Sequence, residues 1–492
     1  MSGAFCLPGR HLPSVAVCYD CVTLIPEWCA MSGSIRKSLL QFVFSGSYMK
    51  RWNDKLRLME LIEIDKQSHK MIVAWLLCQL SARSMNPDER LALEEEVVEG
   101  GIFDYLFRLV ITDIKPPILY RIKENPDHYK RLAEWAITEV EPHLRPLSEI
   151  FWKRFVAYAG NPPKKNLATD ILSAAHLYAS AWEFRLLRHL NEPFDDELAD
   201  IECSFARQLT GYCHLPGMRE LVDGLAPANT GKDGAALLLY LPGLQTLIEN
   251  RTPPPAENGG QARRNCETPL SSRPALSRFA NLCGQLRFQK RWSQTPRTPE
   301  TSVMGHMFIV GCYAYFLSIS LGACPARRVN NFFSGLFHDL PELLTRDIIS
   351  PVKKSFEDLG QIIKEYEESE LARRVLTPLA KEGYKDITER LGYYLGLETG
   401  SEFDDTIVVD GKARRVDFHT LQGVRNSNDC DPKDGEALKV CDILAAYIEA
   451  YTAMRNGITS DQIQQAFWRM REQNAKRMLG NMHIGALFTD FD

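Results

Sequence analysis

The sequence has almost no alternating strand patterns, no strong charge of one sign, and no long run of apolar residues. Its 492 residues carry a formal net charge of −5, which gives no basic surface for nucleic acid or an anionic membrane. No run reaches the roughly 18 consecutive apolar residues that cross a membrane. Pro8, Asp20 and Pro26 also interrupt the first thirty residues, where a signal peptide needs an apolar core. We therefore expect a cytoplasmic protein with neither a membrane nor a nucleic acid as its partner.

The cysteines are not arranged as in a small secreted domain. All 13 are scattered along the chain, and many lie in apolar segments, which predicts reduced, buried thiols. The one suggestive spacing is Cys18-x-x-Cys21, with Cys6 and Cys29 nearby. No second close pair follows it, so the pattern does not favour a structural zinc site. We expect residues 1–34 to be an extension of the folded chain.

Helical periodicity is what the chain has in abundance. Apolar residues recur at helical spacing in residues 56–80, 87–110, 128–140, 168–190, 200–212 and 303–321. One alternating segment, residues 406–416 around Asp410-Gly411, predicts a short hairpin. The sequence therefore predicts an all-α, or mainly α, fold. A polar segment rich in proline and glycine, residues 251–275, predicts a linker between halves at 35–250 and 276–492.

The two halves resemble each other in four places that follow the same order. Lys50-Arg51-Trp52 recurs as Lys290-Arg291-Trp292, the helix around His69 matches that around His306, residues 101–117 match 335–351 without a gap, and residues 170–175 match 442–446. We interpret the halves as tandem copies of one helical domain. In the first copy Asp104-Tyr105 replaces His338-Asp339, and Arg108 replaces Glu342. The first copy is thus expected to keep the scaffold and lose the chemistry.

The candidate site centres on residues 335–347, in which a histidine and an aspartate are adjacent at the end of an apolar segment. Neighbouring helix residues point about 100° apart, so His338 and Asp339 can both reach one ion at a helix end. An aspartate on an apolar segment costs several kcal/mol unless it is paired or bound to metal. The alternative is a solvated carboxylate at an ordinary helix end.

Two further candidates, His306 and Asp442, lie in apolar helical segments of the same half. A lone histidine there is usually a core residue, but two imidazoles and two carboxylates together suit a divalent Mn, Co, Fe, Zn or Mg ion. Such an ion lowers the pKa of its water from about 15.7 towards 7. Glu342 follows Asp339 by one helical turn and can orient or deprotonate that water, although a solvated helix face is its alternative. Arg291 offers a planar fork that matches phosphate.

The order of these residues resembles the HD superfamily of metal-dependent phosphohydrolases. Similarity to its 5′-deoxynucleotidase branch is carried by Arg291-Trp292 upstream of His306, followed by His338-Asp339-x-x-Glu342-x-x-x-x-Asp347-x-x-x-Pro351-Val-Lys353. The resemblance covers about residues 276–455. It implies one ion held by His306, His338, Asp339 and Asp442.

The resemblance also implies roles for the remaining motif residues. Glu342 is expected to orient the attacking water, while Arg291 and Lys353 hold phosphate. Trp292 is expected to pack near the sugar, with Asp347 close by. The implied substrates are deoxyribonucleoside 5′-monophosphates.

The spacing of histidines favours a single ion. Related enzymes with two metals use extra histidines before the last aspartate, whereas only His419 lies between Asp339 and Asp442. We therefore predict a phosphohydrolase that removes phosphate from (deoxy)nucleoside 5′-monophosphates. The alternatives are a triphosphohydrolase or phosphodiesterase that uses the same ion, and a regulator that binds nucleotide without turnover. The branch resembles obligate dimers, so we expect either a homo-oligomer or a first half that replaces the partner subunit.

Overall fold

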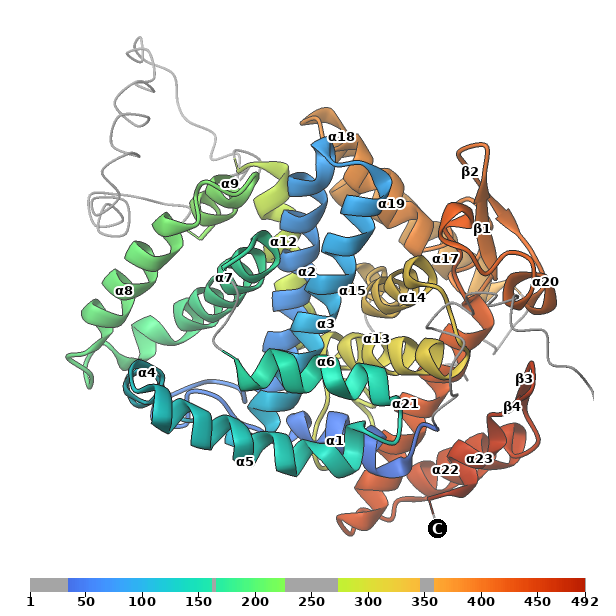
Figure 1. Cartoon of the computed structure of the whole chain (residues 1–492), viewed down its shortest axis with the longest axis horizontal. Helices are drawn as coiled ribbons and strands as arrows, with labels where there is room; N and C mark the ends of the chain where they lie inside the picture. Colours follow the sequence, from blue (N-terminus) through green and yellow to red (C-terminus); the bar gives the residue numbers. More distant parts are fainter. Residues whose placement is uncertain (1–33, 162–164, 226–272, 346–357, 492) are drawn as a thin grey trace, which may run out of the picture.

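The computed structural model describes residues 34–161, 165–225, 273–345 and 358–491, and its all-α character confirms the predicted fold class (Figure 1). The helices of the first half are α1 (Lys37–Phe44), α2 (Glu63–Ser81), α3 (Pro87–Ile111), α4 (Pro116–Glu124), α5 (Pro126–Leu144), α6 (Glu149–Gly160), α7 (Leu167–Asn191), α8 (Leu198–Gly211) and α9 (Met218–Asp223). Those of the second half are α12 (Ala275–Gly284), α13 (Val303–Ser320), α14 (Pro325–Phe337), α15 (Glu342–Thr345), α17 (Leu359–Leu371), α18 (Thr377–Lys381), α19 (Lys385–Tyr394), α20 (Phe418–Gln422), α21 (Gly435–Arg455), α22 (Asp461–Asn474) and α23 (Gly485–Thr489).

Two small antiparallel hairpins complete the described structure: β1 (Thr406–Val409) with β2 (Lys412–Arg415), and β3 (Met478–Leu479) with β4 (Met482–His483). The first confirms the predicted hairpin. Asp410 and Gly411 form its two-residue turn, with φ of 53° and 72°. Positive φ at both positions is what the favoured two-residue hairpin turn requires.

The helix predicted over residues 56–80 begins only at Glu63. The residues before it form a closed turn, because Lys50 pairs with Ile62 in an isolated antiparallel bridge. The second half has the same turn before α13, where Lys290 pairs with Ser302. Trp52 and Trp292 occupy matching places in the two turns, and each has a φ of 56°. The Arg-Trp motif therefore marks the same local structure twice.

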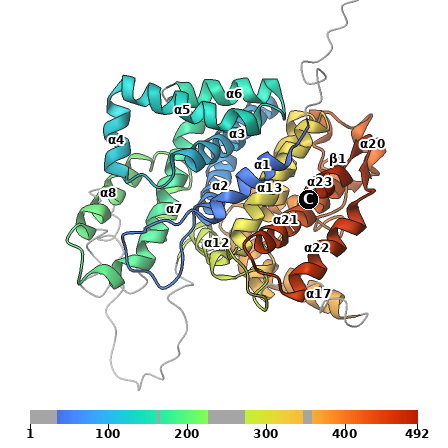
Figure 2. The ribbon, with the colours of Figure 1, turned by 90° about the horizontal axis from the view of Figure 1, so that it is seen from below.

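The two halves share one core and exchange their first helices. Helix α1 packs on α13 of the second half, where the Tyr313 hydroxyl donates to the Leu40 carbonyl at 2.7 Å (Figure 2). In return, α12 packs on α2 of the first half, where His69 Nε2 donates to the Ala280 carbonyl at 3.0 Å. Helices α2 and α13 also contact each other directly, as do α3 and α14. This reciprocal packing joins the halves through a single continuous core.

Helix α13 is the most apolar long helix among the described residues, although His306, two glycines and two serines interrupt its apolar run. By length and composition it is long and apolar enough to cross a membrane, with a mean hydropathy of 1.5 over 18 residues. Within the protein, however, 89% of this helix is buried. The shared core therefore buries the apolar surface of this helix.

A close approach of two backbones fixes α13 against α14. A Cβ atom added to Gly335 would lie 2.7 Å from the Gly311 Cα and 2.9 Å from the Val310 carbonyl carbon. Backbone atoms in packed helices cannot move aside, so we expect Gly335→Ala to lower the free energy of unfolding by about 1–3 kcal/mol. Urea denaturation measures this change.

The matching glycine of the first half provides the control. A Cβ atom at Gly101 would meet the Met71 sulfur at 2.2 Å, but the end of a methionine side chain can rotate away. We expect Gly101→Ala to cost less than Gly335→Ala. Equal losses of stability in the two variants would contradict the backbone argument.

Candidate metal centre

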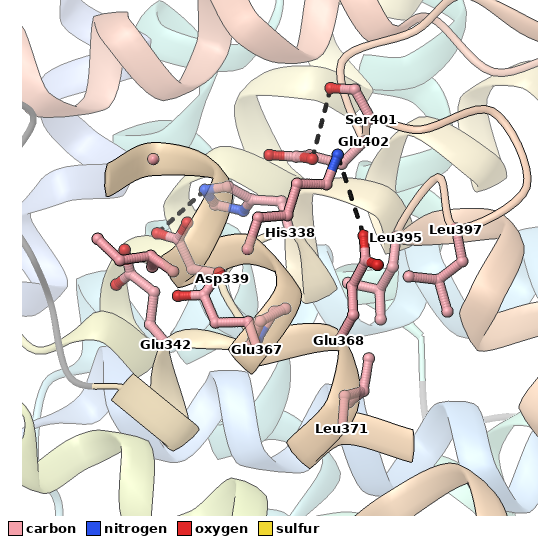
Figure 3. A pocket seen from close by; sticks show the side chains of 14 residues that line it. His338, Asp339, Glu342, Glu367, Glu368, Leu371, Leu395, Leu397, Ser401 and Glu402 are labelled. Carbon is pink, nitrogen blue, oxygen red and sulfur yellow. Dashed lines mark hydrogen bonds and ion pairs between the residues drawn. The ribbon is translucent and has the colours of Figure 1, made fainter. Parts of the chain in front are cut away.

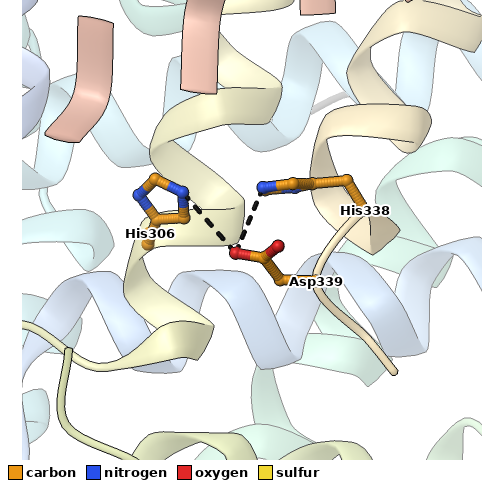
Figure 4. A group of neighbouring side chains, drawn as sticks. All are labelled: His306, His338 and Asp339. Atoms are coloured by element: carbon orange, nitrogen blue, oxygen red, sulfur yellow. Dashed lines mark ion pairs between the residues drawn. The ribbon is translucent and has the colours of Figure 1, made fainter. Parts of the chain in front are cut away.

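Three helices of the second half bring the four predicted ligands together. His306 lies near the start of α13, His338 and Asp339 follow the last residue of α14, and Asp442 lies on α21. His306 Nε2 is 3.0 Å from Asp442 Oδ1 and 3.6 Å from Asp339 Oδ2. His338 Nε2 is 3.2 Å from Asp339 Oδ2 and 4.0 Å from Asp442 Oδ1. Figure 4 shows the two imidazoles converging on the Asp339 carboxylate.

Local structure sets these positions. The Ser302 hydroxyl caps α13 by accepting from the Gly305 amide at 3.0 Å, which fixes the turn that carries His306. Helix α14 ends at Phe337, and the chain then turns as the Leu340 amide donates to the Phe337 carbonyl at 2.8 Å. That turn aims Asp339 at His306 rather than at solvent.

The orientation of His338 suits a metal ligand. Its Nδ1–H donates to the Gly335 carbonyl at 2.8 Å, which leaves the lone pair on Nε2. That Nε2 atom is buried and makes no well-aligned hydrogen bond among the described residues, although Asp339 Oδ2 lies 3.2 Å away. A buried polar atom without a partner is costly, and a bound ion would satisfy it.

The donor set fits one divalent ion. Ligand atoms about 2.0–2.2 Å from an ion lie roughly 3.0–3.6 Å apart, which matches three of the four distances above. The donor atoms of His306, His338 and Asp339 all lie within 4.8 Å of one another, and Asp442 is held to His306. Both histidines are buried, whereas the carboxylates are partly exposed. Substrate and water can therefore approach from the carboxylate side.

The ionisation of the side chains at this site favours a bound cation. Burial favours a neutral Asp339, but His338, His306 and Arg291 hold the pKa of its carboxyl well below the usual range. The bond from His306 likewise lowers the pKa of Asp442 against the effect of burial. For His338, burial is outweighed by Asp339, which raises the pKa of the imidazole to about 9. A divalent ion would take the place of that proton.

Arg291 and Trp292 border this centre and share an anchor that sequence reasoning missed. Arg291 Nη1 is 3.5 Å from Asp339 Oδ2, and its Nε is 3.3 Å from Glu449 Oε2. The Trp292 indole N–H donates to the same Glu449 oxygen at 2.8 Å. Glu449 lies seven residues after Asp442, which is two helical turns along the same face of α21. The sequence signal that could have identified Glu449 is a carboxylate two helical turns after Asp442 in an apolar helix.

We expect Glu449→Gln to lower the free energy of unfolding by about 3 kcal/mol, because it leaves buried arginines without their counter-charge. The pKa of the Glu449 carboxyl lies well below its usual range, since Arg291 and Arg297 outweigh its burial. Glu183 holds Arg51, Trp52 and Arg287 in the same way, so Glu183→Gln is the matched variant.

Both Gln variants are expected to lose stability in chemical denaturation. Only the change at Glu449 frees Arg291 beside the metal ligands, so only this variant should raise the KM for a phosphate ester directly. A Glu449→Gln protein of wild-type stability would contradict the assigned contacts.

A cavity of about 300 Å³ opens beside the ligands. His338, Asp339 and Glu342 line one side of it, so Glu342 faces the same cavity as two of the candidate ligands (Figure 3). The other walls come from α17 and from residues 395–402; their side chains include Ile363, Lys364, Glu367, Glu368, Leu371, Leu395, Leu397, Ser401 and Glu402. The glutamates of these walls were not predicted, because nothing in the sequence ties α17 to the His-Asp segment.

Two predicted site residues, Asp347 and Lys353, lie outside the described residues, as do the cysteines at positions 6, 18, 21 and 29. The linker proposed at 251–275 also falls mostly outside them. In the first half, the two residues matched to ligands are far from forming a site. His69 contacts α12, and Asp170 lies on the surface with His214 3.8 Å away.

Comparison with known proteins agrees with this geometry. Residues 283–471 match a protein-family model described as an HD domain, a span that includes all four ligands and Arg291. No curated protein and no solved structure matches the chain. The second half of this chain therefore contains an HD domain, which supports a metal-dependent phosphohydrolase of the HD superfamily.

Proposed function

We propose that the second half hydrolyses (deoxy)nucleoside 5′-monophosphates to nucleoside and phosphate. The observation that carries this proposal is that His338, Asp339 and Glu342 line one cavity, while His306 and Arg291 contact the same Asp339 carboxylate. Phosphate needs cationic partners, water needs an orienting base, and the rest of the substrate needs a recess. All three lie together here.

In the proposed reaction, His306, His338, Asp339 and Asp442 would hold a divalent ion, which would supply Lewis acidity and lower the pKa of a bound water. Glu342 orients the attacking water and takes up its proton. Arg291, held in place by Glu449 and Asp339, balances the charge that builds on the phosphoryl oxygens. The oxygen of that water bonds to phosphorus, the bond from phosphorus to the 5′ oxygen breaks, and the 5′ oxygen receives the proton held by Glu342 to give the nucleoside.

The cavity walls favour a nucleoside as the leaving group. Glu367, Glu368 and Glu402 offer carboxylates that accept hydrogen bonds from hydroxyl and amino groups, and the leucines beside them offer apolar contact to a base. A volume near 300 Å³ is at the lower end of ligand pockets. A single nucleoside suits that size better than a polymer.

A panel of nucleoside mono-, di- and triphosphates tests the proposal, with Mn, Co or Mg added to the purified protein. Release of orthophosphate from monophosphates is the expected result. Release of pyrophosphate or triphosphate would instead identify a triphosphohydrolase. Tight nucleotide binding with no product would identify a regulator.

We also propose that the first half is a diverged copy of the HD domain that replaces a partner subunit. The repeated Arg-Trp turns and the reciprocal exchange of α1 and α12 support this, because a two-fold dimer makes each of its contacts twice. Residues 273–492 expressed alone should be unstable or should form dimers. A stable, fully active monomer of that fragment would refute the proposal.

A further inference from the structure

A buried lysine of the first half stands where His306 stands in the second. In each half the ligand position follows the bridged residue by four: Lys66 follows Ile62, as His306 follows Ser302. Lys66 Nζ donates to His176 Nδ1 at 2.6 Å, just as His306 contacts Asp442 at 3.0 Å.

The same alignment of the two halves gives the counterpart of His176, the partner of Lys66. His176 precedes Glu183 by seven residues, the spacing between Asp442 and Glu449, and each glutamate accepts from the tryptophan of its own half. Lys66 and His176 are therefore the counterparts of His306 and Asp442. The sequence match of His69 to His306 is three residues out of register, and that of Asp170 to Asp442 is six residues out.

The two remaining positions also lack a free negative charge. Tyr105 stands for Asp339 and donates its hydroxyl to the Val43 carbonyl at 2.5 Å. Asp104 stands for His338, but its charge is matched by Lys70 at 2.5 Å. Both ligand carboxylates have thus been replaced by neutral groups, and an amine stands in the place of the His306 imidazole.

Lys66 differs from the other cations around it. Arg51 lies 2.6 Å from Glu63, Lys70 lies 2.5 Å from Asp104, and Arg108 lies 2.6 Å from Asp113.

For Lys66, the one described carboxylate within 4 Å is that of Glu63, at 3.8 Å, and its hydrogen bond goes to an imidazole. The Lys66 side chain is only 1% exposed, and a buried cation without a close counter-ion costs several kcal/mol.

The surroundings of His176 show where a counter-ion can enter. His176 is exposed, and the Arg108 and Asp104 side chains beside this cluster are partly exposed. The pKa of its imidazole is held well below the usual value, first by desolvation and then by Lys66, Lys70, Arg51 and Arg108. Burial and the same cations lower the pKa of Lys66, although Glu63 opposes this. The exposed imidazole therefore sits in a positive potential.

We propose that the first half binds a phosphate-type dianion at Lys66 and His176 without any metal ion. Such an anion would supply the counter-charge that Lys66 lacks. Its position in the first half would correspond to the position of the substrate phosphate beside the ion in the proposed reaction. Hydrolysis is not expected there, because Arg108 occupies the position of Glu342 and no ion is held. The site is a binding site only, with a phosphate monoester as the natural class of ligand.

The test uses the full-length protein stripped of metal by a chelator, with inorganic phosphate as the probe in titration calorimetry. We expect one phosphate per chain, with binding weakened at least tenfold by Lys66→Gln and by His176→Glu. The second change is at an exposed position, so it tests the proposal even if the buried lysine variant does not fold. His214→Glu, the same change at another exposed histidine of the first half, should bind phosphate like the wild type.

Two results would overturn the proposal. One is the absence of phosphate binding to the metal-free protein, and the other is binding that Arg291→Ala removes while His176→Glu leaves it intact. The outcome is separable from that of the proposed hydrolysis. Nucleotide turnover with metal present reports on the second half, whereas phosphate binding without metal reports on the first.

Discussion

His338→Ala is expected to remove the bound divalent ion and to lower kcat/KM for a nucleoside monophosphate by about 10⁴-fold or more. The side chain supplies a lone pair to the centre from a buried position, and its other nitrogen is held by the Gly335 carbonyl, so no neighbour can replace it. Metal analysis after equilibrium dialysis, run beside a phosphate-release assay, measures both effects.

Asp104→Ala is the matched control, because Asp104 has the place of His338 in the first half. Its carboxylate pairs with Lys70 and with the Tyr158 hydroxyl, so the change should leave the ion content unchanged. If His338→Ala keeps the wild-type ion content, the ligand set is wrong. If Asp104→Ala also loses ion, the first half contributes to the centre in a way that these contacts do not describe.

The second large effect is expected at Glu342. We predict that Glu342→Gln lowers kcat by about 10²–10⁴-fold while the ion content stays at the wild-type level, because the amide cannot accept a proton from water. Glu342 shares the cavity wall with His338 and Asp339 but is not one of the grouped donors. Steady-state kinetics and metal analysis on the same preparation separate catalysis from ion binding.

Glu367→Gln serves as the comparison, since Glu367 lines the same cavity from α17 and accepts a hydrogen bond from Thr345 at 2.6 Å. It is expected to change KM more than kcat, by less than tenfold. A larger loss of kcat in Glu367→Gln than in Glu342→Gln would exchange the roles of the two carboxylates.

Much of the candidate site in the second half could be predicted, because its residues stand out in short sequence segments. The adjacent His338 and Asp339 at the end of an apolar helix, and His306 and Asp442 inside apolar helices, are residues whose burial needs an explanation. A shared ion explains all four at once, and the structure brings them together. The hairpin at Asp410-Gly411 was predictable for a similar reason, since its turn depends on two neighbouring residues only.

The contacts that were missed join residues far apart in the chain. Glu449 reaches back to Trp292 across more than 150 positions, and its role depends on how α21 crosses the Arg-Trp turn. The role of the glutamates of α17 could not be predicted for the same reason, because it depends on how that helix packs beside the cavity.

The alignment of the two halves shows most clearly what the sequence could predict and what it could not. Sequence similarity paired His69 with His306, because two histidines in apolar helices look alike. The bridged turns and the shared tryptophan anchors pair Lys66 with His306 instead.

The sequence by itself determined the helical class, the repeated Arg-Trp motif and the four candidate ligands that the structure brings together. Helical periodicity, turn residues and unexplained buried charge are all properties of short segments. Only the tertiary structure decided which side chain of the first half lies in the place of His306, and that the first helix of each half packs on the other half. Those outcomes depend on helix register and packing between distant segments, where a shift of three residues moves a side chain by nearly one turn.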